Sequence, residues 1–342
     1  MSQHRPVQIS RLRHRYLEPN FMAILPGKCQ ARCRFCIEPE GPPPPSTSAW
    51  LTSFESLLLR ELPPIFRTIS ISGGEPTLSP VFAQALDLLA QARAARRIKR
   101  VVLTTNGSPK SFAKHLDDIG RVVTHVNISR HAADDDDNAK IFKTTKVPRG
   151  DELRDLISQL NRRGIPVNVN CVHSSEQLFG ERLAGVSRSY LRAEAKRFIS
   201  FARSLGASSV VFRHDHRVWD SSRITQLEAA FDDCAVMHEA RCESCRVIGK
   251  VICGLPVNFK QSAYEPVELH MESELYELVL HSDGVLYRDW SRRHPLERPL
   301  EPMAVSEDVR QVLDARPSVR PLLTVPECEP RDASCGLMFA SS

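Results

Sequence analysis

The stretch Cys29-Gln-Ala-Arg-Cys33-Arg-Phe-Cys36 decides how this sequence is interpreted. Its cysteines follow a C-x3-C-x2-C spacing, just after an apolar run at 21–25 that predicts a strand. Three thiolates on one tight loop can bind three irons of a cubane 4Fe–4S cluster and leave the fourth iron without a protein ligand. An open metal position is what a catalytic centre needs. A zinc knuckle and chance are the alternatives, although a structural zinc site normally takes four protein ligands.

A second motif, Ser72-Gly73-Gly74-Glu75-Pro76, follows the next apolar run, residues 68–72. Two adjacent glycines allow the backbone to approach a ligand closely, and the Glu75 carboxylate can accept a hydrogen bond from an ammonium group. A Gly-Gly-Glu alone is most often a turn. This one ends a predicted strand one β-α unit after the cysteines, and ligands of parallel α/β folds bind at the carboxyl ends of strands.

Apolar runs and amphipathic stretches alternate through the first two thirds of the chain, which indicates parallel strands with crossover helices. The continuous apolar character of the runs fits strands buried on both faces. The pattern predicts an α/β fold with a partial (β/α)6 parallel barrel, and a doubly wound open sheet would also satisfy it. Strands are expected at 21–25, 68–72, 100–105, 125–129, 166–172 and 208–213, and helices at 49–61, 81–95, 111–119, 151–163, 190–205 and 224–240.

The pattern changes after residue 240. Short strands are expected at 255–260, 267–271, 276–281 and 285–290, and Ser282-Asp283-Gly284 between the last two is a hairpin signal. The expected organisation is an N-terminal segment (1–17), a core domain (18–240), a small cysteine-bearing β appendage (241–295) and a proline-rich C-terminal tail (296–342).

Composition narrows the class of protein. The net charge of +5 is weak for 342 residues, which excludes a polybasic binder as the default. No apolar run approaches the roughly 20 residues of a membrane-spanning helix, and the basic N-terminus lacks the apolar segment of a signal peptide. A cytoplasmic protein without a membrane or nucleic-acid partner is expected. In that compartment the ten cysteines favour metal or cluster binding over disulfides.

Together the motifs resemble those of the radical S-adenosylmethionine (SAM) enzymes, over roughly residues 18–215. The resemblance is carried by the cysteine triplet with Phe35 before its last cysteine, by Gly-Gly-Glu-Pro, by Thr105-Asn106-Gly107 and by Asn127-Ile-Ser129. It implies that the open iron binds the amine and carboxylate of SAM and that one electron from the reduced cluster cleaves a C–S bond of SAM. The resulting 5′-deoxyadenosyl radical would abstract a substrate hydrogen, while the protein orients and shields it. It also implies an electron donor such as flavodoxin or ferredoxin.

The resemblance assigns roles residue by residue. Cys29, Cys33 and Cys36 would hold the cluster. The residues expected to contact SAM are Phe35 near the adenine, Gly73, Gly74 and Glu75 at the methionine amine, Pro76 shaping the turn, and Asn106, Ser129, Asn168 and Asn170 at the ribose or carboxylate. For Asn168 and Asn170, polar groups satisfied inside the barrel are an equal alternative.

Four later cysteines form a candidate auxiliary metal site: Cys234, Cys242, Cys245 and Cys253. Their region resembles the auxiliary-cluster modules called twitch or SPASM domains, so a second Fe–S cluster, zinc and free thiols are all open. The chain length and the late Cys-x2-Cys resemble the cyclase of molybdenum-cofactor synthesis. That enzyme's Cys-x2-Cys-Asn-Arg context and terminal Gly-Gly are absent, since Arg246 follows Cys245 directly and the sequence ends Ser341-Ser342.

Basic residues follow the carboxyl ends of the fourth and sixth expected strands. Arg130, His131, Arg213, His214 and His216 would form a cationic substrate pocket, with charged surface loops as the alternative. The expected function is a radical SAM enzyme acting on a small molecule, anionic or nucleotide-like, in a biosynthetic pathway. A peptide-modifying radical SAM maturase is the first alternative, and a non-catalytic Fe–S or zinc regulator is the second.

Overall fold

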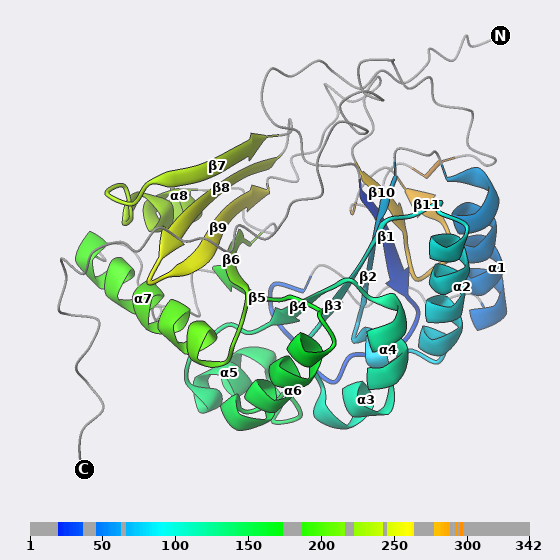
Figure 1. The fold of residues 1–342 in the computed structure, drawn as a ribbon, viewed down its shortest axis with the longest axis horizontal. Helices are drawn as coiled ribbons and strands as arrows, with labels where there is room; N and C mark the ends of the chain where they lie inside the picture. The colour runs from blue at the N-terminus through cyan, green and yellow to red at the C-terminus, as the bar shows by residue number, and fades with distance from the viewer. Residues whose placement is uncertain are drawn as a thin grey trace, which may run out of the picture.

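The computed structural model describes residues 20–36, 46–62, 66–173, 187–215, 222–241, 245–262, 277–287, 290, 292 and 295–296 (Figure 1). Within these ranges one sheet of eleven strands runs in the order β11-β10-β1-β2-β3-β4-β5-β6-β9-β8-β7. Strands β1 to β6 pair in parallel in chain order. The sheet is not closed, and it has the curvature of a partial barrel (Figure 1).

The strands that form the parallel core are β1 (Asn20–Leu25), β2 (Thr68–Gly73), β3 (Arg100–Thr105), β4 (His125–Ser129), β5 (Val167–His173) and β6 (Ser209–His214). The later strands are β7 (Val236–Arg241), β8 (Cys245–Ile252), β9 (Leu255–Ser262), β10 (Glu277–Leu280) and β11 (Leu286–Tyr287). The six expected core strands are therefore confirmed to within one residue at each end.

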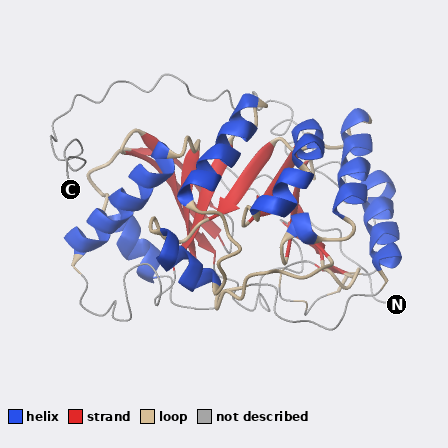
Figure 2. Cartoon of the chain, turned by 90° about the horizontal axis from the view of Figure 1, so that it is seen from below, coloured by secondary structure: helices blue, strands red, loops and turns tan. Residues whose placement is uncertain are grey.

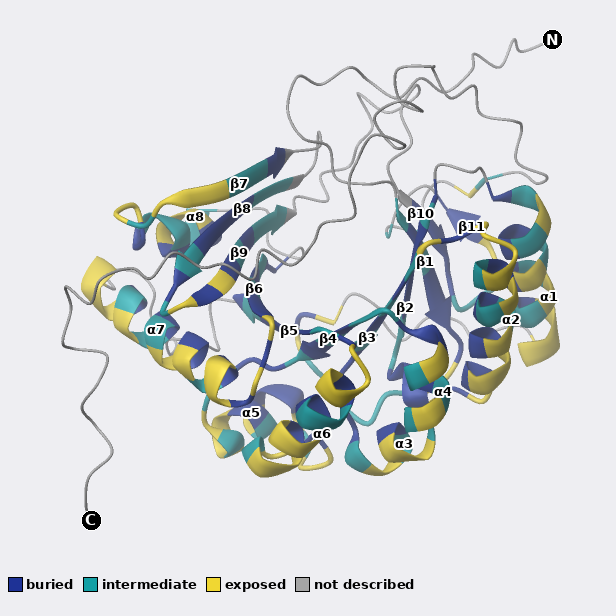
Figure 3. Ribbon diagram, in the orientation of Figure 1, coloured by how far each residue is buried: buried dark blue, intermediate teal, exposed yellow. Residues whose placement is uncertain are grey.

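Helices cover the outer, convex face of the sheet (Figures 1 and 2). They are α1 (Thr47–Ser56), the π-helical turn η1 (Leu57–Glu61), the 3-10 turn η2 (Pro76–Leu78), α2 (Phe82–Ala94), α3 (Pro109–Lys114), α4 (Leu116–Val122), α5 (Asp135–Phe142), α6 (Gly150–Arg162), α7 (Arg188–Ser204) and α8 (Ser222–Ala229). Their inner sides are buried and their outer sides exposed, as amphipathic helices require (Figure 3).

Two apolar clusters hold this layer to the sheet. One joins β1–β4, the first residue of β5, β10 and β11 to α1, α2, α3, α4 and α6, with Trp50 and Phe112 fully buried. The other joins β5, β6 and β9 to α7 and α8, with Phe212 and Phe259 stacked at 5.8 Å. Because the core lies on the convex side, the concave side of the sheet is left for polar residues.

Two expected helices differ from the structure. The helix expected at 111–119 is two short helices that meet at His115, whose ring packs on Phe82 at 5.1 Å. The helix expected at 224–240 is wrong in its second half: α8 ends at Ala229, and Val236–Arg241 is a strand paired with β8. Tertiary pairing outweighs local helix propensity there.

The strands after residue 240 join the same sheet at both of its edges. β9 pairs in parallel with β6 and carries the antiparallel β8 and β7, whereas β10 pairs in parallel with β1 and carries β11. The hairpin expected at Ser282-Asp283-Gly284 is confirmed, with Gly284 at φ 80°. The strand expected at 267–271, the segment 1–17 and nearly all of 296–342 lie outside the described residues. Within the described ranges, no helix has the length and apolarity to cross a bilayer.

Candidate active site

The motif residues meet because each follows the carboxyl end of a neighbouring parallel strand. Gly73 ends β2, Asn106 follows β3 and Ser129 ends β4. The backbone of Ser129 lies opposite that of Asn170 on β5. The cysteine loop leaves the carboxyl end of β1, beside β2. The structure thus brings Gly73, Asn106, Ser129 and the cysteine loop together at the carboxyl ends of the parallel strands.

The cysteine loop is fixed by its neighbours. Gln30 donates a hydrogen bond from Nε2 to Asn106 Oδ1 at 2.8 Å, and the Arg32 amide donates to the Phe142 carbonyl at 2.9 Å. The Cys36 amide closes a turn on the Cys33 carbonyl at 3.2 Å. The loop is therefore anchored both to the end of β3 and to the end of α5.

A cluster binds thiolates, so iron must displace the protons of the cysteine thiols. Burial raises the pKa of Cys29 to about 11, with the charges of Glu75 and Cys36 adding to the rise, and that of Cys33 to about 12, with Cys36 and Cys29 adding to it. Among the described residues, no three His, Cys, Asp or Glu side chains form a site for a single metal ion. A cubane does not need such convergence, because each thiolate binds a different iron.

The sulfur of Cys29 already receives two N–H groups. The Ala31 amide donates to it at 3.3 Å and Asn106 Nδ2 at 3.7 Å. Hydrogen bonds of this kind stabilise a thiolate and tune the potential of a cluster. The residues present therefore fit a 4Fe–4S cluster held by Cys29, Cys33 and Cys36.

The two glycines of the second motif are required by close packing. A Cβ at Gly74 would lie 2.9 Å from the Cys29 amide nitrogen and 3.0 Å from the Lys28 carbonyl carbon. At Gly73, where φ is 155°, it would lie 2.8 Å from the Leu25 carbonyl oxygen. Both contacts are with backbone, which cannot give way easily. The Gly-Gly pair lets the end of β2 lie directly against the cysteine loop.

Glu75 is buried and ties three elements together. Its Oε1 accepts from Thr105 Oγ1 at 2.6 Å and from Thr77 Oγ1 at 2.7 Å, and its Oε2 accepts from the Asn106 amide at 2.8 Å. Burial raises the pKa of Glu75, and these hydrogen bonds oppose the rise. In this arrangement the carboxylate fixes the ends of β2 and β3, and Pro76 begins the following turn η2.

The Phe35 side chain packs in an aromatic cluster with His131 and Phe142. The Phe35 and His131 rings are T-shaped with centroids 4.7 Å apart, and the His131 and Phe142 ring centroids are 4.9 Å apart. His131 is fully buried, its Nδ1 accepts from the Val172 amide at 3.1 Å, and burial lowers its pKa to about 3. A neutral imidazole therefore supports Phe35 from β4 and α5.

Comparison with known proteins agrees with this geometry. Residues 24–175 match the family model described as the Radical SAM superfamily. This part of the chain is therefore similar to the radical SAM domain. The match includes the cysteine loop, the Gly-Gly-Glu-Pro motif and the ends of β3, β4 and β5. No curated protein sequence matches the chain.

Solved radical SAM structures share the fold. SuiB of Streptococcus suis bound to S-adenosylmethionine superposes with a TM-score of 0.51 at 13% identity, over 82% of this chain and 61% of SuiB. SuiB bound to its precursor peptide SuiA gives 0.52 at 12% identity, over 89% and 68%. Native anSMEcpe with bound AdoMet and the Cp18Cys peptide gives 0.50 at 13% identity, over 86% and 82%. The chain thus spans about three fifths of the first SuiB chain, and the likeness is one of fold.

The two asparagines of β5 differ in their surroundings. Asn168 donates to Asn127 Oδ1 at 3.0 Å and accepts from Ser209 Oγ at 2.6 Å, so its amide is satisfied within the sheet. Asn170 is 6% exposed, and its Oδ1 has no hydrogen-bond partner among the residues that the structure describes. A buried unsatisfied acceptor is costly, which makes Asn170 the better candidate for a ligand contact.

The residues of the expected cationic pocket do not form one site in the structure. Arg130 is 1% exposed, and its guanidinium donates to the carbonyls of Ala132, Pro148 and Ala133 and to Asp135 Oδ1 at 2.7 Å. It fixes the β4–α5 loop rather than a substrate. His131 belongs to the aromatic cluster, His214 is buried opposite His173 on β5, and His216 lies outside the described residues. Arg213 is partly exposed.

The four later cysteines do not share one place. Cys234 precedes β7 and Cys253 follows β8, so both lie at the amino end of the neighbouring β9. Cys245 begins β8, eight residues from Cys253, which places the two backbones about 26 Å apart. The expectation that all four ligate one metal is therefore wrong, because an extended strand separates them. Cys242 lies outside the described residues.

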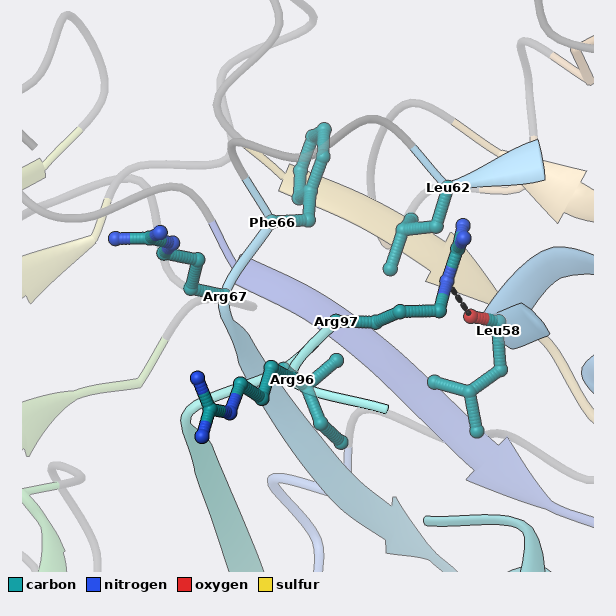
Figure 4. A pocket seen from close by; sticks show the side chains of 7 residues that line it. Leu58, Leu62, Phe66, Arg67, Arg96 and Arg97 are labelled. Carbon is teal, nitrogen blue, oxygen red and sulfur yellow. Dashed lines mark hydrogen bonds between the residues drawn. The ribbon is translucent and has the colours of Figure 1, made fainter. Parts of the chain in front are cut away.

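A small cavity of about 150 Å³ lies at the amino ends of the strands, where β2 and β3 begin (Figure 4). Arg97 donates there to the Leu58 carbonyl at 3.2 Å. The cysteine loop leaves the other end of these strands, so this cavity is separate from the candidate active site. Its lining residues are Leu58, Leu62, Phe66, Arg67, Arg96, Arg97 and Ile98.

Sequence reasoning missed three residues that shape the site. Gln30 lies inside the cysteine triplet, Thr77 follows the Gly-Gly-Glu-Pro motif, and Thr105 begins the Thr105-Asn106-Gly107 motif, but none of the three was given a role. Their polarity beside the motif residues was the available signal. Their partners, Asn106 and Glu75, become visible only when the strand ends are placed side by side.

Proposed function

We propose that this protein is a radical SAM enzyme that holds a 4Fe–4S cluster on Cys29, Cys33 and Cys36 and binds SAM along the ends of β2 to β5. The observation that carries the proposal is the anchored cysteine loop, whose Cys29 sulfur accepts two N–H groups and against which Gly74 packs without room for a side chain. When bound, the cluster and SAM supply an electron and a 5′-deoxyadenosyl radical that removes a substrate hydrogen.

The chain's own residues bind and orient these groups. The backbone of Gly73 and Gly74, which packs directly against Leu25 and the cysteine loop, would offer polar groups to the methionine amine. Ser129, Asn106 and Asn170 lie along the ends of successive strands and would contact the ribose and carboxylate. Phe35, held by His131, would contact the adenine. Glu75 positions the ends of β2 and β3 through its hydrogen bonds.

We propose an anionic small molecule as the substrate, a cytoplasmic location, and flavodoxin or ferredoxin as the electron donor. One observation favours a peptide as the second candidate substrate: the SuiB and anSMEcpe structures of similar fold include complexes with peptides. A non-catalytic regulator would need neither SAM cleavage nor a site for a hydrogen donor.

Anaerobic reconstitution tests the proposal. The wild type is expected to retain about four irons per chain at the triplet and to form 5′-deoxyadenosine from SAM when reduced. The triple variant Cys29→Ala/Cys33→Ala/Cys36→Ala should lose these four irons and the product. Cys171→Ala is the matched control, since Cys171 lies in the apolar core of β5. If the triple variant keeps all its iron, the proposal fails.

Additional irons that survive in the triple variant would indicate an auxiliary cluster. Because Cys234 and Cys253 lie at the far end of β8 from Cys245, two pairwise variants separate the candidate ligands. Loss of those irons in Cys242→Ala/Cys245→Ala, but not in Cys234→Ala/Cys253→Ala, would assign them to the carboxyl end of β9.

A further inference from the structure

Strands β6 and β9 carry a pair of cations that the site described above does not use. Arg213 on β6 and Lys260 on β9 are direct partners in the parallel register, so their backbones lie about 4.8 Å apart. Both side chains are partly exposed. In the described part of the chain, neither has a hydrogen bond or an ion pair.

The alternation of side chains places this pair on the concave face. Phe212 and Phe259, which precede the two cations, stack on each other in the convex core beneath α7 and α8. Successive side chains of a strand point to opposite faces. Arg213 and Lys260 therefore lie on the face that also carries Asn170, where SAM is proposed to bind.

The neighbours of the pair do not neutralise it. Val172 on β5 lies beside Arg213, and Val247 on β8 lies beside Lys260. Like charges directly opposite each other on neighbouring strands destabilise a sheet. With valines on both flanks, an anion between the two cations would remove this repulsion.

Two residues closer to the amino ends of the strands, the same face carries asparagine side chains. Asn170 on β5 and Asn258 on β9 flank Val211 of β6, about 7 Å from the cation pair along the strands. Within the described ranges, Asn170 Oδ1 lacks a hydrogen-bond partner. The face thus offers two positive charges, apolar flanks and amide groups at a fixed spacing.

We propose that Arg213 and Lys260 bind an anionic group of the substrate, a carboxylate or a phosphate, and that Asn258 contacts a polar group of the same molecule. The inference rests on the proposed function and names the part of the site that recognises the substrate. Arg213 offers a planar fork of donors, and Lys260 offers a compact charge. Both groups suit carboxylate and phosphate oxygens. The site adjoins Asn170, so the bound substrate would lie next to SAM.

Anion binding to the full-length protein, reconstituted anaerobically, tests this inference. Isothermal titration at constant ionic strength would use inorganic phosphate in one arm and succinate in the other, against chloride. The wild type should bind phosphate or succinate saturably, and the anion that binds more tightly identifies the class of substrate group. Arg213→Gln/Lys260→Gln should weaken that binding at least tenfold. Lys260→Arg, which keeps the charge, should stay within about threefold.

Two further variants make the test decisive. Lys114→Gln removes an exposed lysine of α3 and should leave anion binding unchanged. Lys260→Glu places a carboxylate beside Arg213 and should abolish anion binding while raising the melting temperature, which rules out unfolding as the cause. Equal affinity in the wild type and the double glutamine variant would overturn the inference, and so would a wild type that binds neither anion.

The wild type alone separates failure of this inference from failure of the proposed function. If it binds the anion through Arg213 and Lys260 but forms no 5′-deoxyadenosine, the proposed function fails and the anion site stands. If it forms 5′-deoxyadenosine but binds neither probe, the anion site fails and the radical SAM assignment stands.

Discussion

The contact between Gly74 and the cysteine loop can be tested by adding one methyl group. In Gly74→Ala the new Cβ would lie 2.9 Å from the Cys29 nitrogen, 3.0 Å from the Lys28 carbonyl carbon and 3.1 Å from the Cys29 Cβ. Ordinary carbon contacts are about 3.5–4.0 Å, so the loop must move by roughly half an ångström or more. Overpacking of this kind costs about 1–3 kcal/mol. The displacement falls on a cluster ligand, so the cost should appear mainly as lost iron.

We expect Gly74→Ala to retain less than half of the wild-type iron after anaerobic reconstitution and to lose 1–3 kcal/mol of unfolding free energy in urea as the apoprotein. Gly150→Ala is the matched control, since its Cβ would meet Phe201 at an ordinary 3.5 Å at the start of α6. It should retain all iron and stability. Wild-type iron and SAM affinity in Gly74→Ala would refute the claim that the Gly-Gly pair exists to seat the loop.

Four other substitutions probe the site's polar groups. Glu75→Gln removes an acceptor from the donors Thr105 and Asn106 and should cost about 1–3 kcal/mol in urea unfolding. The pKa of His131 is about 3 in the folded protein against an ordinary 6.5. Between these pH values the imidazole binds a proton in the unfolded chain but not in the folded protein. Below pH 6.5 its contribution to stability should fall by about 1.4 kcal/mol per pH unit, or about 2 kcal/mol at pH 5. Compared with the wild type, His131→Phe should therefore lose about 2 kcal/mol less stability between pH 8 and pH 5, although it is less stable at both. Asn168→Ala should lower unfolding free energy by about 1–3 kcal/mol, whereas Asn170→Ala should weaken SAM binding in equilibrium dialysis and leave stability nearly unchanged.

The core strands and the first site were predictable because both follow from local patterns. Each parallel strand is an uninterrupted apolar run, and each motif directly follows one. What could not be predicted was which later strand lies beside which earlier one. The strand at 255–262 was expected, yet nothing in its sequence places Lys260 opposite Arg213 on β6. The helix expected at 224–240 failed for the same reason, because Val236–Arg241 becomes a strand only by pairing with β8.

The same limit explains the error over the later cysteines. Spacing along the chain suggested one site for Cys234, Cys242, Cys245 and Cys253, as it had for the first triplet. The first triplet lies in a compact loop, where sequence distance measures spatial distance. Between Cys245 and Cys253 the chain is an extended strand, in which each residue adds about 3.3 Å. Cysteine spacing therefore predicts a metal site only where the intervening chain turns back on itself.

The polar residues of the concave face show why the site occupies the strand ends. Near the amino ends of β5 and β6, the side chains of Asn127, Asn168 and Ser209 are linked in a row by hydrogen bonds. Two residues nearer the carboxyl ends, Asn170 Oδ1 has no partner among the described residues, and two residues beyond it the cations Arg213 and Lys260 have no counterion there either. Buried polar groups are normally satisfied within the fold. The first row therefore contributes to the stability of the sheet, whereas we propose that bound ligands satisfy the other two rows. This is the physical reason to place SAM and the substrate anion on neighbouring strands of one face.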